Sequence, residues 1–267
     1  METIAEKNTL QLTDTHCHLN LLDLQPFAGE MSAVLAEAKA AGVGRFVCIG
    51  VEALTQPEVL ALAKKFPEVY ATVGIHPNHV HEHPVNWDCL TAWAREDKVV
   101  AIGETGLDYH YTPEHAPLQQ EIFSGHVDLA RRLNLPLVVH TREAAEDTLA
   151  ILRSAGSKAG VMHCFTETWE VARKALDLGF YISFSGVVTF KNAGALREVA
   201  RKVPDDCLLI ETDSPWLAPV PHRGKHNRPA WVLAVATVLA EIRNCSLESL
   251  AEQTTCNASR LFGFPLE

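Results

Sequence analysis

The sequence has few features that would tie it to a membrane or to disulfide bonds. No apolar run approaches the roughly 18 residues of a membrane span, and residues 1–12 lack the apolar segment of a signal peptide. The seven cysteines are scattered and never spaced as C-x-x-C, which argues against both a disulfide framework and a structural zinc knuckle. We therefore expect a soluble protein of a reducing compartment, the cytoplasm.

Positive charge is also scarce. The chain has 23 Lys and Arg against 33 Asp and Glu, a formal net charge of −10, so no global positive field would attract a polyanion. An enzyme that brings its cations to a phosphate as bound metal ions is still allowed. Linkers, low-complexity blocks and repeats are missing too, so we expect a single domain over residues 1–267, with no membrane and no obligate protein partner inferred.

The chain does contain eight short apolar or β-branched runs, separated by stretches with the spacing of amphipathic helices. Such alternation is typical of βα units and a parallel sheet. Residues 117–133 illustrate a helical stretch, because its apolar residues share one face and Pro117 suits the first turn. Eight units predict an α/β fold, the TIM-like (β/α)8 barrel. The expected strands are residues 10–14, 45–49, 70–75, 99–103, 136–139, 160–162, 181–184 and 208–210.

Residues able to bind a metal follow these predicted strands. A (β/α)8 barrel builds its active site at the carboxyl ends of the strands, so residues far apart in sequence meet on one rim. Imidazole and carboxylate groups are the usual ligands of zinc, manganese and similar ions. The expected rim residues are His16 and His18 after the first strand, His76 after the third, Glu104 after the fourth, His140 after the fifth, His163 after the sixth and Asp213 after the eighth.

Each of these residues also has a purely structural interpretation. His16 and His18 point the same way on a strand and form either a chelate or a pair of hydrogen-bonded core histidines. Glu104 is costly at the top of a buried strand unless it binds metal or pairs with Arg or Lys, and we favour a bridging ligand. Asp213 is either a ligand or a helix N-cap, and Glu211 lies at the same strand end.

Two groups near the rim have weaker signals. His79, His81 and His83 alternate as in a chelator, but we interpret them as part of a solvated loop. A basic stretch lies directly beyond the eighth predicted strand. Its Arg223 and Lys225 either contact a substrate phosphate or belong to another solvated loop.

Nearly end to end, the chain resembles the TatD family of metal-dependent deoxyribonucleases, within the amidohydrolase-like superfamily. The motifs that carry the resemblance are Asp-Thr-His-Cys-His-Leu (14–19), Gly-Ile-His-Pro (74–77), Gly-Glu-Thr-Gly-Leu-Asp-Tyr (103–109), His-Thr-Arg-Glu-Ala (140–144), Met-His-Cys-Phe (162–165), Glu-Thr-Asp-Ser-Pro (211–215) and Arg-Gly-Lys (223–225). Departures from the family pattern are Asn20, where members usually carry Asp, and residues 226–229, where they often carry Arg-Asn-Glu-Pro. These departures affect no expected ligand.

The resemblance implies a TIM-like barrel that binds two divalent ions, Mg²⁺, Mn²⁺ or Zn²⁺. The ligands of the first ion would be His16, His18, Glu104 and Asp213, and those of the second Glu104, His140 and His163. It places His76 near the substrate phosphate, and we expect Asp108 to bind substrate as well.

The expected activity is hydrolysis of DNA phosphodiester bonds, by resemblance as a 3′–5′ exonuclease on single strands. Two ions about 3.5–4 Å apart would bind a phosphate oxygen and orient a water, with Glu104 shared between them and Asp213 as general base. The alternative is an enzyme acting on a small ester, lactone or amide, because the same ions polarise a carbonyl. The complete ligand set argues against a third alternative, a non-catalytic metal-binding or scaffold protein.

Overall fold

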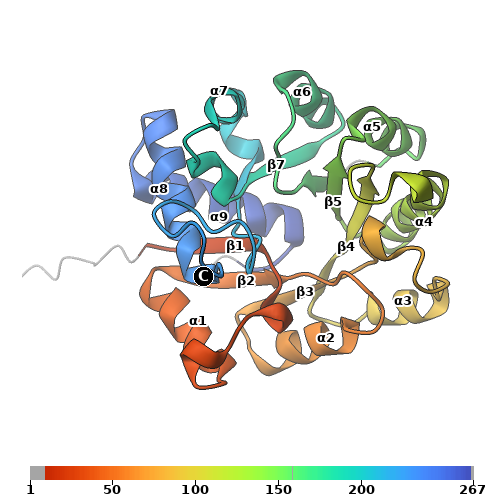
Figure 1. The fold of residues 1–267 in the computed structure, drawn as a ribbon, viewed down its shortest axis with the longest axis horizontal. Coiled ribbons are helices and arrows are strands. Elements are labelled where there is room, and N and C mark those ends of the chain that lie inside the picture. The colour runs from red at the N-terminus through yellow and green to blue at the C-terminus, as the bar shows by residue number, and fades with distance from the viewer. Residues whose placement is uncertain (1–9, 158, 266–267) are drawn as a thin grey trace, which may run out of the picture.

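The computed structural model describes residues 10–157 and 159–265. Its eight strands are all parallel and follow one another around a single sheet in chain order, with the helices outside them (Figure 1). The predicted TIM-like barrel is therefore confirmed. The strands are β1 Leu12–Cys17, β2 Val43–Cys48, β3 Val69–Val73, β4 Val99–Asp108, β5 Leu137–Arg142, β6 Gly160–Met162, β7 Phe180–Phe184 and β8 Leu208–Ile210.

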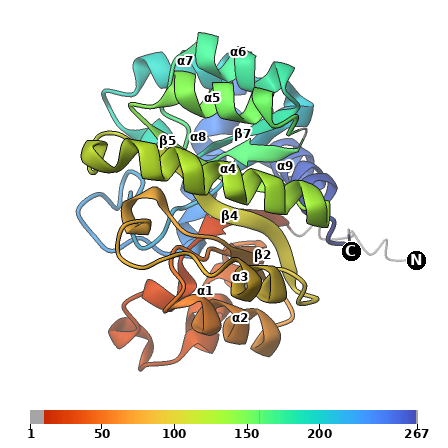
Figure 2. The same cartoon turned by 90° about the vertical axis from the view of Figure 1, so that its right-hand side faces the viewer.

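The helices bury one face each against the strands. In α4, Ile122 and Leu129 are buried, and the helix ends at Leu133, followed by Asn134 in the left-handed conformation. This helix lies across β4 on the outside of the barrel (Figure 2). The α-helices are α1 Met31–Ala40, α2 Gln56–Lys65, α3 Trp87–Trp93, α4 Ala116–Leu133, α5 Ala145–Ser154, α6 Trp169–Asp177, α7 Gly194–Lys202, α8 Val232–Arg243 and α9 Leu247–Phe262.

Short 3-10 helices occupy many of the connections. They are Leu19–Leu21, Gln25–Phe27, Pro77–His79, Pro113–His115, Gly186–Thr189, Asp205–Cys207 and Pro229–Trp231. Within the described ranges no single helix is long and apolar enough to cross a membrane, and Pro229–Arg243 with Leu247–Phe262 passes that test only as a pair bent by 109°.

Three strands run further toward the rim than their apolar runs predict. His16 lies inside β1, Glu104 inside β4 and His140 inside β5, whereas each was expected to follow its strand. Residues 105–108 of β4 pair with residues 139–142 of β5, so the backbone ladder continues beyond the apolar run of residues 99–103. The apolar run shows which part of the strand is surrounded by the hydrophobic core, whereas hydrogen bonds to the adjacent strands decide where the strand ends.

A separate cluster of buried apolar residues fills the inside of the barrel. On β5, β6 and β8 its members alternate with residues that pack against the surrounding helices, as period-two side chains must. Phe264 stacks on Tyr70 near the start of β3 and helps to close the amino-terminal end of the barrel. We call this cluster the interior core: Val47, Ile49, Val100, Ala101, Val138, Val161, Leu209, Ala258, Phe262 and Phe264.

The barrel closes between β1 and β8 through individual hydrogen bonds. Between these strands the described residues form only an isolated parallel bridge, from Cys17 to Ser214. The Asp213 backbone N–H donates to the His16 carbonyl at 2.9 Å, and the His18 N–H donates to the Ser214 carbonyl at 2.8 Å. This closure sets three of the expected ligands side by side.

Candidate metal centre

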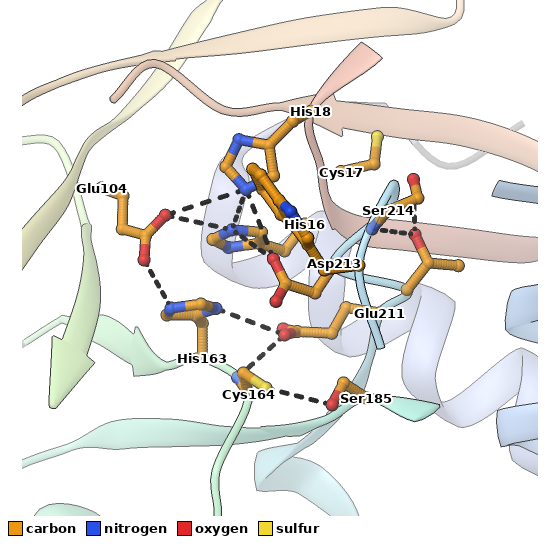
Figure 3. Close-up of polar contacts among 12 residues, drawn as sticks. His16, Cys17, His18, Glu104, His163, Cys164, Ser185, Glu211, Asp213 and Ser214 are labelled. Carbon is orange, nitrogen blue, oxygen red and sulfur yellow. Dashed lines mark hydrogen bonds and ion pairs between the residues drawn. The ribbon is translucent and has the colours of Figure 1, made fainter. Parts of the chain in front are cut away.

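The histidines and carboxylates of the site stand directly above the interior core. His140 lies on β5, two residues after Val138 of the interior core. His163 directly follows β6, two residues after Val161 of the same core. Side chains two positions apart on a strand point to the same face of the sheet, so both imidazoles face the inside of the barrel. Glu104 enters from β4, and its carboxylate contacts the imidazoles of both His16 and His163, whose rings stack on each other with their centres 3.9 Å apart (Figure 3).

Four side chains converge on the β1/β8 side of the centre. The Nε2 atoms of His16 and His18 are 3.2 Å apart. Asp213 Oδ1 is 3.5 Å from the first of these nitrogens and 3.3 Å from the second, and Glu104 Oε2 is 3.3 Å and 3.9 Å from them (Figure 3). We call this group the β1/β8 set: His16, His18, Glu104 and Asp213.

A second group converges on the other oxygen of the same carboxylate. Glu104 Oε1 is 2.8 Å from His163 Nε2 and 3.1 Å from His140 Nδ1, and these two nitrogens are 3.4 Å apart. We call this group the β5/β6 set: Glu104, His140 and His163. Glu104 thus presents one oxygen to each set.

These donor atoms fit divalent ions. Neutral imidazole nitrogens that face one another at 3.2 Å repel unless a proton or a cation lies between them. Two ligands bound to one tetrahedral zinc at its usual bond lengths lie roughly 3.3 Å apart, and most donor separations within each set are close to this value. The described residues contain clusters of His and Glu that can hold a metal, including His16, His18 and Glu104 together.

Burial and mutual charge shift the ionisation of the centre. Burial by itself would raise the pKa of Glu104, but the charge of His163 and the contact with His140 are among the effects that lower it well below its ordinary value. Burial likewise opposes a charged His163, yet Glu104 and Glu211 raise its pKa well above the ordinary value. The negative charge of Glu104 is therefore stabilised by its histidine neighbours, and it would stabilise a cation in the same position.

Two further carboxylates hold the imidazoles of the β5/β6 set from behind. Glu211 Oε1 lies 3.3 Å from His163 Nδ1, and Asp108 Oδ2 lies 3.1 Å from His140 Nε2. Each imidazole thus presents one nitrogen to Glu104 and the other to a buried carboxylate, the arrangement that fixes the tautomer of a ligating histidine. In the sequence Glu211 is visible only as a second carboxylate beside Asp213.

Asp108, which was expected to bind substrate, is enclosed by the protein. Its side chain is buried, and Oδ1 accepts the backbone N–H groups of His110 and Tyr111 at 3.0 and 2.9 Å. Oδ2 accepts from Asn78 Nδ2 at 3.4 Å in addition to its contact with His140. With both oxygens engaged, the side chain is placed to orient His140.

The hydrogen bonds of His76 fix its protonation. Its Nδ1 accepts the backbone N–H of Asn78 at 3.1 Å, so the proton of the neutral ring is on Nε2. That Nε2 lies 3.4 Å from Glu104 Oε1 and faces the centre. Burial lowers the pKa of His76 to about 4, and the ring is therefore a neutral donor at ordinary pH.

The other histidines and the basic loop lie away from the two sets. His81 and His83 are exposed, and His79 is 2.8 Å from Glu82, consistent with a solvated loop. Arg223 and Lys225 are exposed in the loop after β8, where the Arg223 guanidinium lies 3.8 Å from the centre of the Phe190 ring.

Asp213 caps no helix. It has φ 56°, and no helix begins at the residues that directly follow β8. Burial would raise its pKa, but contact with His18 and the charge of His16 lower it. In the described part of the chain Glu104 has no Arg or Lys within ion-pair distance, and its five ion-pair partners are all histidines.

The barrel, the converging imidazoles and the shared carboxylate define a metal-dependent hydrolase of the TIM-barrel class. The family model described as TatD related DNase matches residues 13–263, and the chain belongs to this family.

Similar proteins agree with this assignment. The chain is 51% identical to the metal-dependent hydrolase YcfH of Escherichia coli over 256 residues, 94% of this chain and 95% of that protein. It is 42% identical to the metal-dependent hydrolase YabD of Bacillus subtilis, over 94% of this chain and 98% of that one. The crystal structure of the TatD homologue YJJV from Escherichia coli superimposes with a TM-score of 0.87 at 32% identity, covering 95% and 98% of the two chains.

Proposed function

We propose that this protein hydrolyses phosphodiester bonds of DNA and shortens single strands from the 3′ end, using two divalent ions. The observation that carries the proposal is the position of Glu104, whose two oxygens face two different sets of nitrogen ligands. A carboxylate shared in this way is typical of two-metal sites that clamp a phosphate. The family description as a DNase supports DNA as the substrate.

Each set would hold one ion. His16, His18, Glu104 and Asp213 would hold the first, and Glu104, His140 and His163 the second. Bound there, Mg²⁺, Mn²⁺ or Zn²⁺ supplies Lewis acidity, which stabilises charge on the phosphate and lowers the pKa of a coordinated water. Asp108 and Glu211 hold the rings of His140 and His163 in place.

The remaining side chains handle the proton and the phosphate. Asp213 uses Oδ1 for its contacts with His16 and His18, and Oδ2 is then available to accept a proton from the attacking water. His76 donates its Nε2–H to a phosphate oxygen. Arg223 and Lys225 contact the phosphate backbone beyond the scissile bond.

The test is cleavage of end-labelled single-stranded DNA by chelator-stripped protein, with Mg²⁺, Mn²⁺ or Zn²⁺ restored in turn. Glu104→Ala is the inactive variant, and Glu121→Ala, which removes an exposed carboxylate from α4, is its matched control. We expect metal-dependent, stepwise shortening by the wild type and the control, and none by Glu104→Ala.

Two outcomes would contradict the proposal. Intact DNA under every metal, with metal still bound, would exclude a deoxyribonuclease, and turnover on a panel of small esters and lactones would then favour the alternative substrate class. Stepwise cleavage that survives in Glu104→Ala would exclude the bridging role of this carboxylate.

A further inference from the structure

One large aromatic side chain at the metal centre is exposed without an evident structural reason. Trp216, three residues after the ligand Asp213, is 50% exposed. Its ring meets His18 edge to face, with the ring centres 4.9 Å apart. Buried tryptophan contributes strongly to stability, so an indole left half in water beside a metal ligand is available to bind something else.

The backbone under this side chain is held firmly. The Trp216 N–H donates to the Asp213 carbonyl at 2.9 Å. The buried side chain of Asn227 donates to the carbonyls of Trp216 at 2.6 Å and Thr212 at 2.8 Å. Further along the loop, the Val220 N–H donates to Thr189 Oγ1 at 2.8 Å.

This combination suits a binding platform. An exposed aromatic ring on a rigid loop loses little conformational freedom when a flat ligand stacks on it. The same loop carries the exposed cations Arg223 and Lys225, which can follow a phosphate backbone. Aromatic rings combined with basic groups are the usual means of holding single-stranded nucleic acid, because every base has a face that can stack.

We propose that Trp216 stacks on a nucleobase adjacent to the scissile phosphate and thereby selects unpaired strands. The inference rests on the proposed function and names its substrate more closely. In a duplex the faces of the bases are covered by their neighbours, so only a single strand or a frayed end presents a free face to the indole.

The test compares four proteins: wild type, Trp216→Ala, Trp216→Phe and Leu54→Ala. The last is the matched control, because Leu54 is 70% exposed on the loop after β2, at the same end of the barrel, and has no ring. Each is assayed on a single-stranded oligonucleotide and on two versions with an abasic nucleotide on the 5′ or the 3′ side of the scissile bond. Bound metal and thermal unfolding are measured for every variant.

We expect Trp216→Ala to lower kcat/KM on the normal oligonucleotide by about 5- to 150-fold, the effect of losing one stacked base. The loss should vanish on one of the abasic substrates, because the partner of the indole is already missing there. Trp216→Phe should recover most of the activity, and Leu54→Ala should match the wild type on all substrates.

Other results overturn the inference in distinguishable ways. If the wild type cleaves the oligonucleotide and Trp216→Ala does so equally well, or is slowed equally on normal and abasic substrates, the indole does not stack on a base. If the wild type cleaves none of the substrates under any metal, the proposed function fails and this inference fails with it.

Discussion

The lower and the upper part of the barrel interior are built from the same strands but have opposite chemistry. Val138, Val161 and Leu209 belong to the interior core, and two residues further along the same strands or directly beyond them come His140, His163 and Glu211. The first three are buried among apolar side chains, whereas His140 and His163 contact the shared carboxylate of Glu104 and Glu211 contacts the far side of the His163 ring.

The comparison shows that residues that stabilise the fold and residues of the candidate metal centre lie only two positions apart in the sequence. One period of a β-strand keeps the side chain on the same face of the sheet while moving it from the core to the rim. Substitutions in the interior core should therefore affect unfolding, and substitutions one period above should affect metal binding and turnover. Three substitutions test this separation, and a fourth concerns a buried histidine outside both regions; the expected effects decrease from the first to the last.

Glu104→Gln should have the largest effect. It keeps the shape of the side chain but removes the charge that faces both ligand sets, so we expect kcat/KM to fall by about 10³-fold or more. Metal content measured after dialysis should fall as well. Retention of full activity with two bound ions per chain would show that the carboxylate does not join the two sets.

Leu209→Ala should lower the stability of the fold and have little effect on turnover per folded molecule. Truncating a fully buried leucine leaves a cavity and lowers the free energy of unfolding by about 2–5 kcal/mol. The measurement is denaturant unfolding of the metal-free protein, together with turnover per folded molecule in the metal-loaded form. A loss of turnover as large as that of Glu104→Gln would show that the two regions are not separable.

Asp108→Asn should weaken metal binding less than Glu104→Gln does. It weakens the contact that orients His140 while keeping its shape, so we expect metal affinity to fall by about 10- to 100-fold with little change in stability. Asp147→Asn is the control, because that carboxylate is exposed and accepts from the Tyr109 hydroxyl. If Asp108 binds substrate instead, KM will rise and metal affinity will not change.

His126 is a buried polar residue that belongs to neither region. Its Nδ1–H donates to the Ile122 carbonyl at 2.8 Å and its Nε2 accepts the Ile75 N–H at 3.2 Å, so the folded protein needs the neutral ring. Burial lowers its pKa to about 4 from an ordinary 6.5. As pH falls from 6.5 toward 4, the unfolded chain takes up a proton that the folded chain does not, and stability decreases.

The measurement is the free energy of unfolding against pH for wild type and His126→Gln. The wild type should lose up to about 1.4 kcal/mol more per pH unit in this interval than the variant. Parallel curves would mean that His126 is protonated in the folded state as readily as in the unfolded one.

The sequence by itself determined the barrel and most of the candidate ligands. Eight apolar runs at βα spacing are sufficient for the fold, because parallel strands buried on both faces must be almost continuously apolar. The rim residues are recognisable because a histidine or a carboxylate at the end of such a run does not contribute to a hydrophobic core. Strand ends were less accurate: β4 runs on to Asp108, because pairing with β5 extends it past its apolar part.

Only the tertiary structure decided how those residues are arranged. Which oxygen of Glu104 faces which imidazole depends on how β1, β4, β5 and β6 approach one another. The positions of Asp108 and Trp216 likewise follow from contacts between segments distant in the chain, with His140 in one case and with Asn227 and His18 in the other. Periodicity in a sequence reports which side chains avoid water, whereas the distance between two polar atoms is set by the packing of the whole barrel.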